Sequence, residues 1–221
     1  MMQGKEFLKP WQRHRYFQNM LNLLEPATQG MQARKDVLCK VARALNEAGI
    51  LWSLSCSAAL YFFGIVETFG DYDILVRDQD FEKLKSVLAS VGVEMKETKQ
   101  KKEFASPYYQ QAKYGEVEFD LIAKFWISMP GMNYCYDLMA EDIVYFEFDG
   151  VKIPALAVEV QLVLYGYMIG WQEARKFKMQ LCLDYLRDNG VKRKSYFRSF
   201  LEEPDTPIAV KEAIRELLPQ E

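Results

Sequence analysis

Two aspartates separated by one residue, Asp71 and Asp73, are the first residues whose types and spacing suggest chemistry. They begin the run Asp71 to Val76, which continues with the aromatic and β-branched residues typical of a strand. Successive side chains of a strand point to opposite faces, so both carboxylates lie on the same side. Like charges this close raise each other's pKa unless a cation lies between them, and Mg²⁺ prefers such oxygen ligands. The pair therefore predicts a Mg²⁺ site.

A later acidic run, residues 116–122, can supply a third carboxylate. It alternates strictly, with acidic residues on one face and apolar residues on the other. Beside the strand of Asp71 and Asp73, it would complete a two-metal centre able to hold a triphosphate and activate an attacking hydroxyl. We prefer Asp120 as the third ligand because apolar residues flank it as they flank Asp73. Glu118 remains the alternative, because a register shift of two residues keeps both on the same face.

A turn of small residues precedes the acidic pair. The segment Leu54 to Leu60 joins an apolar run to an expected helix, and it contains Ser55, Cys56 and Ser57. Backbone N–H groups at the start of a helix bind phosphate well. Ser55 and Ser57 add hydroxyl donors, so both are candidate nucleotide-binding residues.

The order of these features resembles that of the polymerase-beta-like nucleotidyltransferases. That family has a Gly-Ser turn and helix, then an acidic pair separated by one residue, then a single acid on a later strand. The resemblance spans about Leu51 to Ala123, and the turn Leu54 to Leu60 followed by Gly70 to Val76 carries most of it. It implies the nucleotidyltransferase fold.

The resemblance also implies roles for individual residues. Asp71, Asp73 and Asp120 would bind Mg²⁺, and Ser57 would hold a phosphate oxygen. The implied reaction transfers a nucleoside monophosphate from an NTP, with ATP the first expectation, to a hydroxyl of a small molecule or a protein. Pyrophosphate would be released.

A basic pair further along the chain matches another part of the resemblance. Many small bacterial members carry an Arg-x-x-Lys-Asp-like motif near the start of a helix, and Arg175 and Lys178 fit its spacing. Residues three apart share one face of a helix, so both could contact a nucleotide. The alternative is a solvated charged face, because Glu173 and Lys176 lie beside them.

Departures from the family pattern favour other interpretations. Ser55 and Cys56 stand where the family usually has two glycines, and Met179 stands where an aspartate would follow Lys178. One alternative is therefore a catalytically inactive protein that binds nucleotide or a protein partner as a regulatory, antitoxin-like module. A second is a transferase that modifies an antibiotic or a sugar alcohol.

The elements that must position these residues follow from hydrophobic periodicity. We expect helices over 35–48 and 57–64, and a helix over 78–90 capped by Asp78. Strands are expected over 50–54 and 71–76 and within 93–123. A hairpin should join 145–148 to 151–153 through Asp149 and Gly150. Helices over 158–169, 173–188 and 206–218 should follow Pro154.

These elements and the resemblance predict the α/β (α+β) class. We expect a mixed β-sheet flanked by helices, plus a C-terminal helical region. Residues 1–29 would form an N-terminal extension, 30–155 the nucleotidyltransferase domain and 156–221 a helical region closing one side of the cleft. The aromatic residues Tyr61 to Phe63, Trp126 and Trp171 are expected in the core.

Composition limits the classes of partner. The 28 Lys and Arg against 31 Asp and Glu leave a net charge of -3, which provides no field for long nucleic acid. The four cysteines are far apart and His14 is the sole histidine, so we expect reduced, mostly buried thiols and no zinc site, disulfide framework or Ser-His-Asp hydrolase. No apolar window approaches the about 18 residues of a membrane helix, and a cytoplasmic protein is expected.

Overall fold

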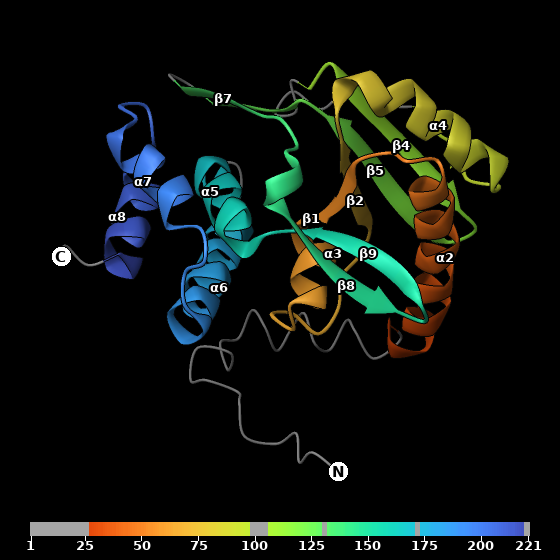
Figure 1. The fold of residues 1–221 in the computed structure, drawn as a ribbon, viewed down its shortest axis with the longest axis horizontal. Coiled ribbons are helices and arrows are strands. Elements are labelled where there is room, and N and C mark those ends of the chain that lie inside the picture. The colour runs from red at the N-terminus through yellow and green to blue at the C-terminus, as the bar shows by residue number, and fades with distance from the viewer. Residues whose placement is uncertain (1–26, 98–105, 130–131, 171–172, 219–221) are drawn as a thin grey trace, which may run out of the picture.

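The structure, a computed structural model, describes residues 27–97, 106–129, 132–170 and 173–218 (Figure 1). Most of the expected N-terminal extension, including His14, lies outside these residues, as does Trp171. Within them, a mixed sheet with helices on both sides is followed by a group of helices, which confirms the expected fold class.

The central sheet has seven strands in the order β3-β4-β5-β2-β1-β9-β8. Its strands are β1 (Trp52–Ser55), β2 (Tyr72–Val76), β3 (Glu94–Met95), β4 (Tyr108–Tyr114), β5 (Val117–Ala123), β8 (Ile143–Phe148) and β9 (Val151–Leu156). β2 pairs antiparallel with β1 and parallel with β5, and β1 pairs parallel with β9. The two acidic strands predicted from the sequence, β2 and β5, are therefore neighbours at the middle of the sheet.

Seven α-helices are described around this sheet. They are α2 (Ala27–Glu47), α3 (Cys56–Phe62), α4 (Phe81–Ser90), α5 (Val158–Met168), α6 (Glu173–Asn189), α7 (Lys194–Glu202) and α8 (Ile208–Leu217). Figure 1 shows α2 and α4 on one side of the sheet and α5 to α8 grouped on the other side of the molecule. The sheet thus lies between two groups of helices.

Strand alternation gives the sheet two different faces. Tyr72 and Ile74 of β2 belong to the core that includes the apolar residues of α2 and α4. Leu75, which points the other way, belongs to the second core, with the apolar residues of α5 to α8. Asp73 shares the face of Leu75 because side chains alternate along a strand. The acidic side chains therefore lie on the face that adjoins the C-terminal helices.

The C-terminal region packs around α5, which is buried along its whole length. A Cβ at Gly166 would lie 2.1 Å from Cγ2 of Val210, so glycine permits the close approach of α5 and α8. Four helices are present here, whereas three were predicted. The helix that was missed is α7. It buries only Phe197, and its other, mostly polar residues are typical of a loop between helices.

A second hairpin, β6 (Phe125–Met129) and β7 (Met132–Tyr136), was also missed. Tyr134 of β7 stacks on Tyr167 of α5 with ring centroids 4.1 Å apart, which ties the hairpin to the helices. The prediction of a core Trp126 was wrong, since its side chain is 38% exposed. Alternation along β6 turns its neighbours Phe125 and Ile127 inward and Trp126 outward.

Two turn predictions had different outcomes. Asp149 and Gly150 join β8 to β9 with φ angles of 48° and 68°, as expected for a hairpin turn of this sequence. Asp78, however, is not the cap of α4. It begins a single 3₁₀ turn, and its Oδ2 pairs with Nζ of Lys124 at 2.6 Å, while α4 starts at Phe81.

The four cysteines are free: Cys39 and Cys182 are buried, Cys56 is half-buried and Cys135 is exposed. The expectation of buried thiols is thus right for two of the four. Within the described ranges, none of the helices combines the length and the apolar composition that crossing a bilayer requires.

Candidate active site

Polar side chains from four adjacent strands form a single row across the sheet. Ladder pairing places Gln111 of β4 opposite Asp120 of β5, Asp120 opposite Asp73 of β2, and Asp73 opposite Ser55 of β1. Residues directly opposite one another in a ladder share a face of the sheet. The structure therefore brings Asp73, Asp120 and Ser55, all predicted from the sequence, to one place.

Asp71 joins this group from the residue just before β2. Burial raises the pKa of Asp73 to about 7, and the negative charges of Asp71 and Asp120 add to the rise. Lys178 and Arg175 oppose it. Burial and the charge of Asp120 likewise raise the pKa of Asp71. The negative charges of Asp71 and Asp120 therefore disfavour the ionisation of Asp73.

Tyr72, between the two aspartates, fixes the direction of their side chains. Its ring stacks on Phe119 with centroids 5.4 Å apart, and its hydroxyl donates to the carbonyl of Arg34 at 3.0 Å. Tyr72 has no exposed surface. A slip of one residue in β2 would move this ring to the polar row and the carboxylates into the apolar core of α2 and α4, so the core holds Asp71 and Asp73 on the other face.

The choice between Glu118 and Asp120 was open at the level of sequence. The register places Asp120 opposite Asp73, and Nε2 of Gln111 donates to its Oδ1 at 3.2 Å. Glu118 is exposed and forms an ion pair with Lys96, which lowers the pKa of Glu118. This geometry favours Asp120 as the third carboxylate of the site.

The first residue of α3 has a backbone conformation that glycine favours. Cys56 has a φ of 51°, in the left-handed region, which costs a non-glycine residue about 1 kcal/mol. Burial raises the pKa of its thiol to about 12, helped by the charge of Asp73, so the thiol stays protonated. Because α3 has only seven residues, phosphate binding here would rest mainly on side chains such as Ser57.

A wall of cationic side chains faces this turn from α6. Nζ of Lys178 donates to Oγ of Ser57 at 2.5 Å, across 121 positions of sequence. Lys178 and Arg175 are both half-buried, and both are charged partners of Asp73. The structure therefore places these two residues towards the carboxylates, whereas the sequence left a solvated face open as the alternative.

Two residues of the site had no signal in the sequence. Gln111 was seen only as part of a run of strand-like residues, and its contact with Asp120 depends on the register of β4. Gln161 of α5 is 1% exposed and donates from Nε2 to the carbonyl of Cys56 at 3.5 Å. Only long-range pairing of strands and helices could have identified them.

The donor set suits a divalent cation by its chemistry. Within the described residues, no three His, Cys, Asp or Glu side chains are arranged as ready metal ligands. Yet three carboxylates meet where burial and mutual repulsion raise the pKa of Asp73, and a divalent cation would relieve that repulsion. Carboxylates with open positions for water and phosphate are the ligands that Mg²⁺ takes.

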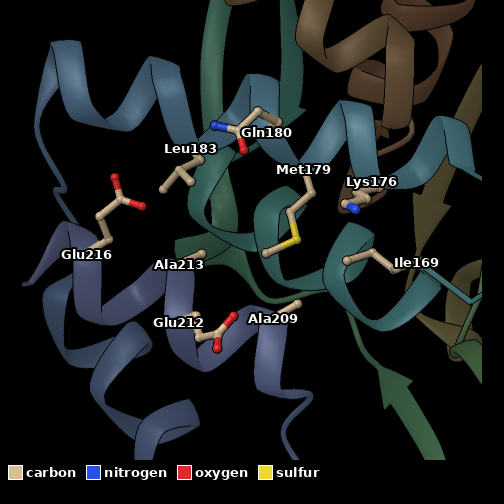
Figure 2. A pocket seen from close by; sticks show the side chains of 9 residues that line it. All are labelled: Ile169, Lys176, Met179, Gln180, Leu183, Ala209, Glu212, Ala213 and Glu216. Atoms are coloured by element: carbon tan, nitrogen blue, oxygen red, sulfur yellow. The ribbon is translucent and has the colours of Figure 1, made fainter.

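A cavity of about 230 Å³ lies elsewhere, between α6 and α8 (Figure 2). Its lining includes Lys176, Met179 and Leu183 of α6, and Ala213 of α8. None of its lining residues is a carboxylate of the row or one of the two cations that face it. This cavity is therefore separate from the candidate active site.

Solved structures share this fold. TM1012 from Thermotoga maritima, a proposed nucleotidyltransferase, is 16% identical and superposes over 70% of this chain and 92% of its own, with a TM-score of 0.50. ANT(2'')-Ia in complex with adenylyl-2''-tobramycin is 13% identical over 82% of this chain and 96% of its own, with a TM-score of 0.51. The solution structure of the antibiotic-resistance factor ANT(2'')-Ia gives 14% identity, coverage of 76% and 92%, and a TM-score of 0.52.

Neither a protein-family model nor a curated protein matches the sequence. At these low identities, the similarity to solved structures concerns the fold alone. The chain has a nucleotidyltransferase fold, as its resemblance to the polymerase-beta-like nucleotidyltransferases implied.

Proposed function

We propose that this chain is a Mg²⁺-dependent nucleotidyltransferase of the cytoplasm that transfers a nucleoside monophosphate from an NTP, ATP first, to a hydroxyl group. The proposal rests on an acidic wall and a basic wall that face each other. The row with Asp73 and Asp120 lies on one side, and Lys178, bonded to Ser57, lies on the other. An acidic wall opposite a basic one suits a metal-bound polyphosphate.

Different residues of the chain would hold the metal and the phosphates. Asp71, Asp73 and Asp120 would hold Mg²⁺, which when bound neutralises charge on the triphosphate and polarises the reacting phosphate. Arg175 and Lys178 would bind phosphate oxygens by charge-assisted hydrogen bonds. The hydroxyls of Ser55 and Ser57 would complete the phosphate contacts.

Asp120 would also act on the acceptor. It accepts the proton of the acceptor hydroxyl as the new bond forms between that oxygen and the α-phosphorus. The bond from the α-phosphorus to the bridging oxygen breaks, and pyrophosphate leaves. Gln111 donates to Oδ1 of Asp120 and so helps to hold this carboxylate in place for the task.

A small molecule is the acceptor that we favour over a protein. ANT(2'')-Ia, which shares the fold, is described with an adenylylated antibiotic, adenylyl-2''-tobramycin. The net charge of -3 is compatible with a cationic or neutral small molecule. We therefore propose that the acceptor of this chain is a hydroxyl of an aminoglycoside-like molecule or of a sugar alcohol.

The test is transfer of label from α-³²P-ATP to a panel of aminoglycoside, lincosamide and sugar-alcohol acceptors in the presence of Mg²⁺. Release of pyrophosphate would be followed in parallel. We expect label on at least one acceptor with the wild type and none with Asp120→Asn. Nucleotide binding by the wild type without transfer to any acceptor or to added protein would contradict enzymatic activity.

The second candidate is a nucleotidyltransferase-like binding or regulatory module without turnover, and the turn at Cys56 favours it. Cysteine occupies a left-handed position there, where a glycine would allow closer approach of a phosphate to the backbone. A stable complex with a second protein, isolated together with bound nucleotide that remains intact, would support this candidate over the enzyme.

A further inference from the structure

Two helices present polar side chains to the turn formed by residues 55–57. On α5, Gln161 and Tyr165 are four residues apart and so share a face, and Gln161 reaches the carbonyl of Cys56. On α6, Lys178 reaches Oγ of Ser57. Tyr165 therefore faces the same turn as its neighbour Gln161.

Tyr165 is buried, and its hydroxyl is left unpaired by the residues that the structure describes. The side chain is 1% exposed, and its hydroxyl makes no hydrogen bond to any described residue. Nε of Arg175 is likewise buried and without a hydrogen bond in the part of the chain that the structure describes. Buried polar atoms without partners are costly to a folded protein and rare. Two of them near one turn suggest a ligand that both contact.

The surroundings indicate the charge of that ligand. Nζ of Lys178 lies 5.8 Å from the centroid of the Tyr165 ring. Burial raises the pKa of Tyr165, with Cys56 and Asp73 contributing and Arg175 opposing, so the hydroxyl stays protonated as a donor. Two cations and a neutral hydroxyl donor favour an anionic oxygen, and phosphate supplies several.

We propose that the Tyr165 hydroxyl is a further nucleotide-binding residue, which donates a hydrogen bond to a phosphate oxygen of the bound nucleotide beside Nε of Arg175. This inference rests on the proposed function, since it assumes that the nucleotide phosphates lie against the turn. It adds a residue of α5, a mostly apolar helix, to the phosphate contacts.

The experiment removes only the hydroxyl, with Tyr165→Phe. The affinity for a non-hydrolysable ATP analogue with Mg²⁺ is measured by isothermal titration, and the unfolding temperature is measured without nucleotide. We expect about 10-fold weaker binding, since a hydrogen bond to a charged group is lost, and an unchanged or higher unfolding temperature. Loss of a merely structural hydrogen bond would instead lower the unfolding temperature.

A matched control is available on the same helix. Tyr167 is 3% exposed and stacks on Tyr134, and two positions along a helix turn its side chain away from the face of Tyr165. Tyr167→Phe should therefore bind the analogue as the wild type does. Tripolyphosphate and adenosine serve as further probes, and Tyr165→Phe should weaken only the former.

Each of the other outcomes would overturn either this inference or the proposed function. Equal affinity of Tyr165→Phe and the wild type would overturn the inference and leave the proposed function standing. Weaker binding of adenosine with unchanged binding of tripolyphosphate would overturn the assignment to phosphate. No binding of any nucleotide analogue by the wild type would overturn the proposed function, and with it this inference.

Discussion

The two walls of the candidate site are built in different ways. The acidic wall comes from neighbouring strands, where the register sets Asp120 opposite Asp73 and the stacked rings of Tyr72 and Phe119 hold the other face. The basic wall comes from α6, which follows the sheet in sequence, and its contact from Lys178 to Ser57 spans 121 positions. Strand pairing thus fixes one wall, while helix packing sets the other.

The two walls also differ in their electrostatic energy. The acidic wall is rigid but carries carboxylates that repel one another, so its geometry is maintained at an electrostatic cost. The basic wall offsets part of that cost through Lys178 and Arg175. A ligand that carries both a divalent cation and phosphate complements the two walls together.

The largest expected effect is on the acidic wall. Asp120→Asn should lower the rate of nucleotide transfer by about 10³-fold, because metal binding and proton acceptance are both lost. Glu118→Gln is the matched control and should retain the rate, since Glu118 is exposed and paired with Lys96. Initial rates of label transfer from α-³²P-ATP measure both. A reversed order of the two variants would assign the third carboxylate to Glu118.

The next effect is on the basic wall. Lys178→Ala should weaken binding of the ATP analogue by about 10- to 100-fold, since a charged hydrogen-bond donor is removed from the phosphates. Lys176, on another face of the same helix, lines the separate cavity and is exposed. Isothermal titration of Lys176→Ala should give the affinity of the wild type. Similar losses of affinity in both variants would show that Lys178 acts through its general positive charge and not through a contact with the phosphates.

A third prediction concerns the electrostatic cost of the acidic wall. The folded protein raises the pKa of Asp73 from 3.8 to about 7, so between these values the folded state binds more protons than the unfolded state. Stability without Mg²⁺ should therefore fall as the pH rises through this window.

Asp73→Asn removes that cost. In EDTA at pH 8, its free energy of unfolding in urea should exceed that of the wild type by up to about 4 kcal/mol, and the two should converge below about pH 4. Asp137 is exposed, and Asp137→Asn should show no such gain. A less stable Asp73→Asn at pH 8 would mean that the carboxylate stabilises the fold.

The smallest effect is at the turn between the walls. Cys56→Gly relieves the left-handed strain but adds backbone entropy to the unfolded chain, so stability should change by less than about 1 kcal/mol. Nucleotide affinity should be retained or modestly improved. Thermal unfolding and titration of the variant check this. A large loss of affinity would show that the Cys56 side chain itself contributes to binding.

The sequence predicted the acidic wall because its signals are local. Alternation places Asp71 with Asp73, and the hairpin turn at Asp149 and Gly150 follows from residue type alone. Trp126 was misplaced because hydrophobic character does not tell which face of a strand is buried. Asp78 has the right type for a cap, yet Lys124, brought near by β5, engages it instead.

The basic wall and its supporting residues depend on contacts between distant parts of the chain. Spacing singled out Arg175 and Lys178, but their direction depends on how α6 packs on α5. Tyr165 and Gln161 lie in a mostly apolar helix, and neither belongs to a sequence motif. Gln111 required the register of β4. Such pairings are fixed by the whole core, so one sequence alone does not reveal them.

Mg²⁺-dependent nucleotide binding is tested most directly by isothermal titration of the purified protein with a non-hydrolysable ATP analogue, with and without Mg²⁺, repeated on the Asp71→Asn/Asp73→Asn double variant. We expect Mg²⁺-dependent binding by the wild type that the double variant loses. Binding that is equal with and without Mg²⁺ and unchanged in the double variant, or no binding of ATP, GTP, CTP or UTP analogues by the wild type, would contradict it.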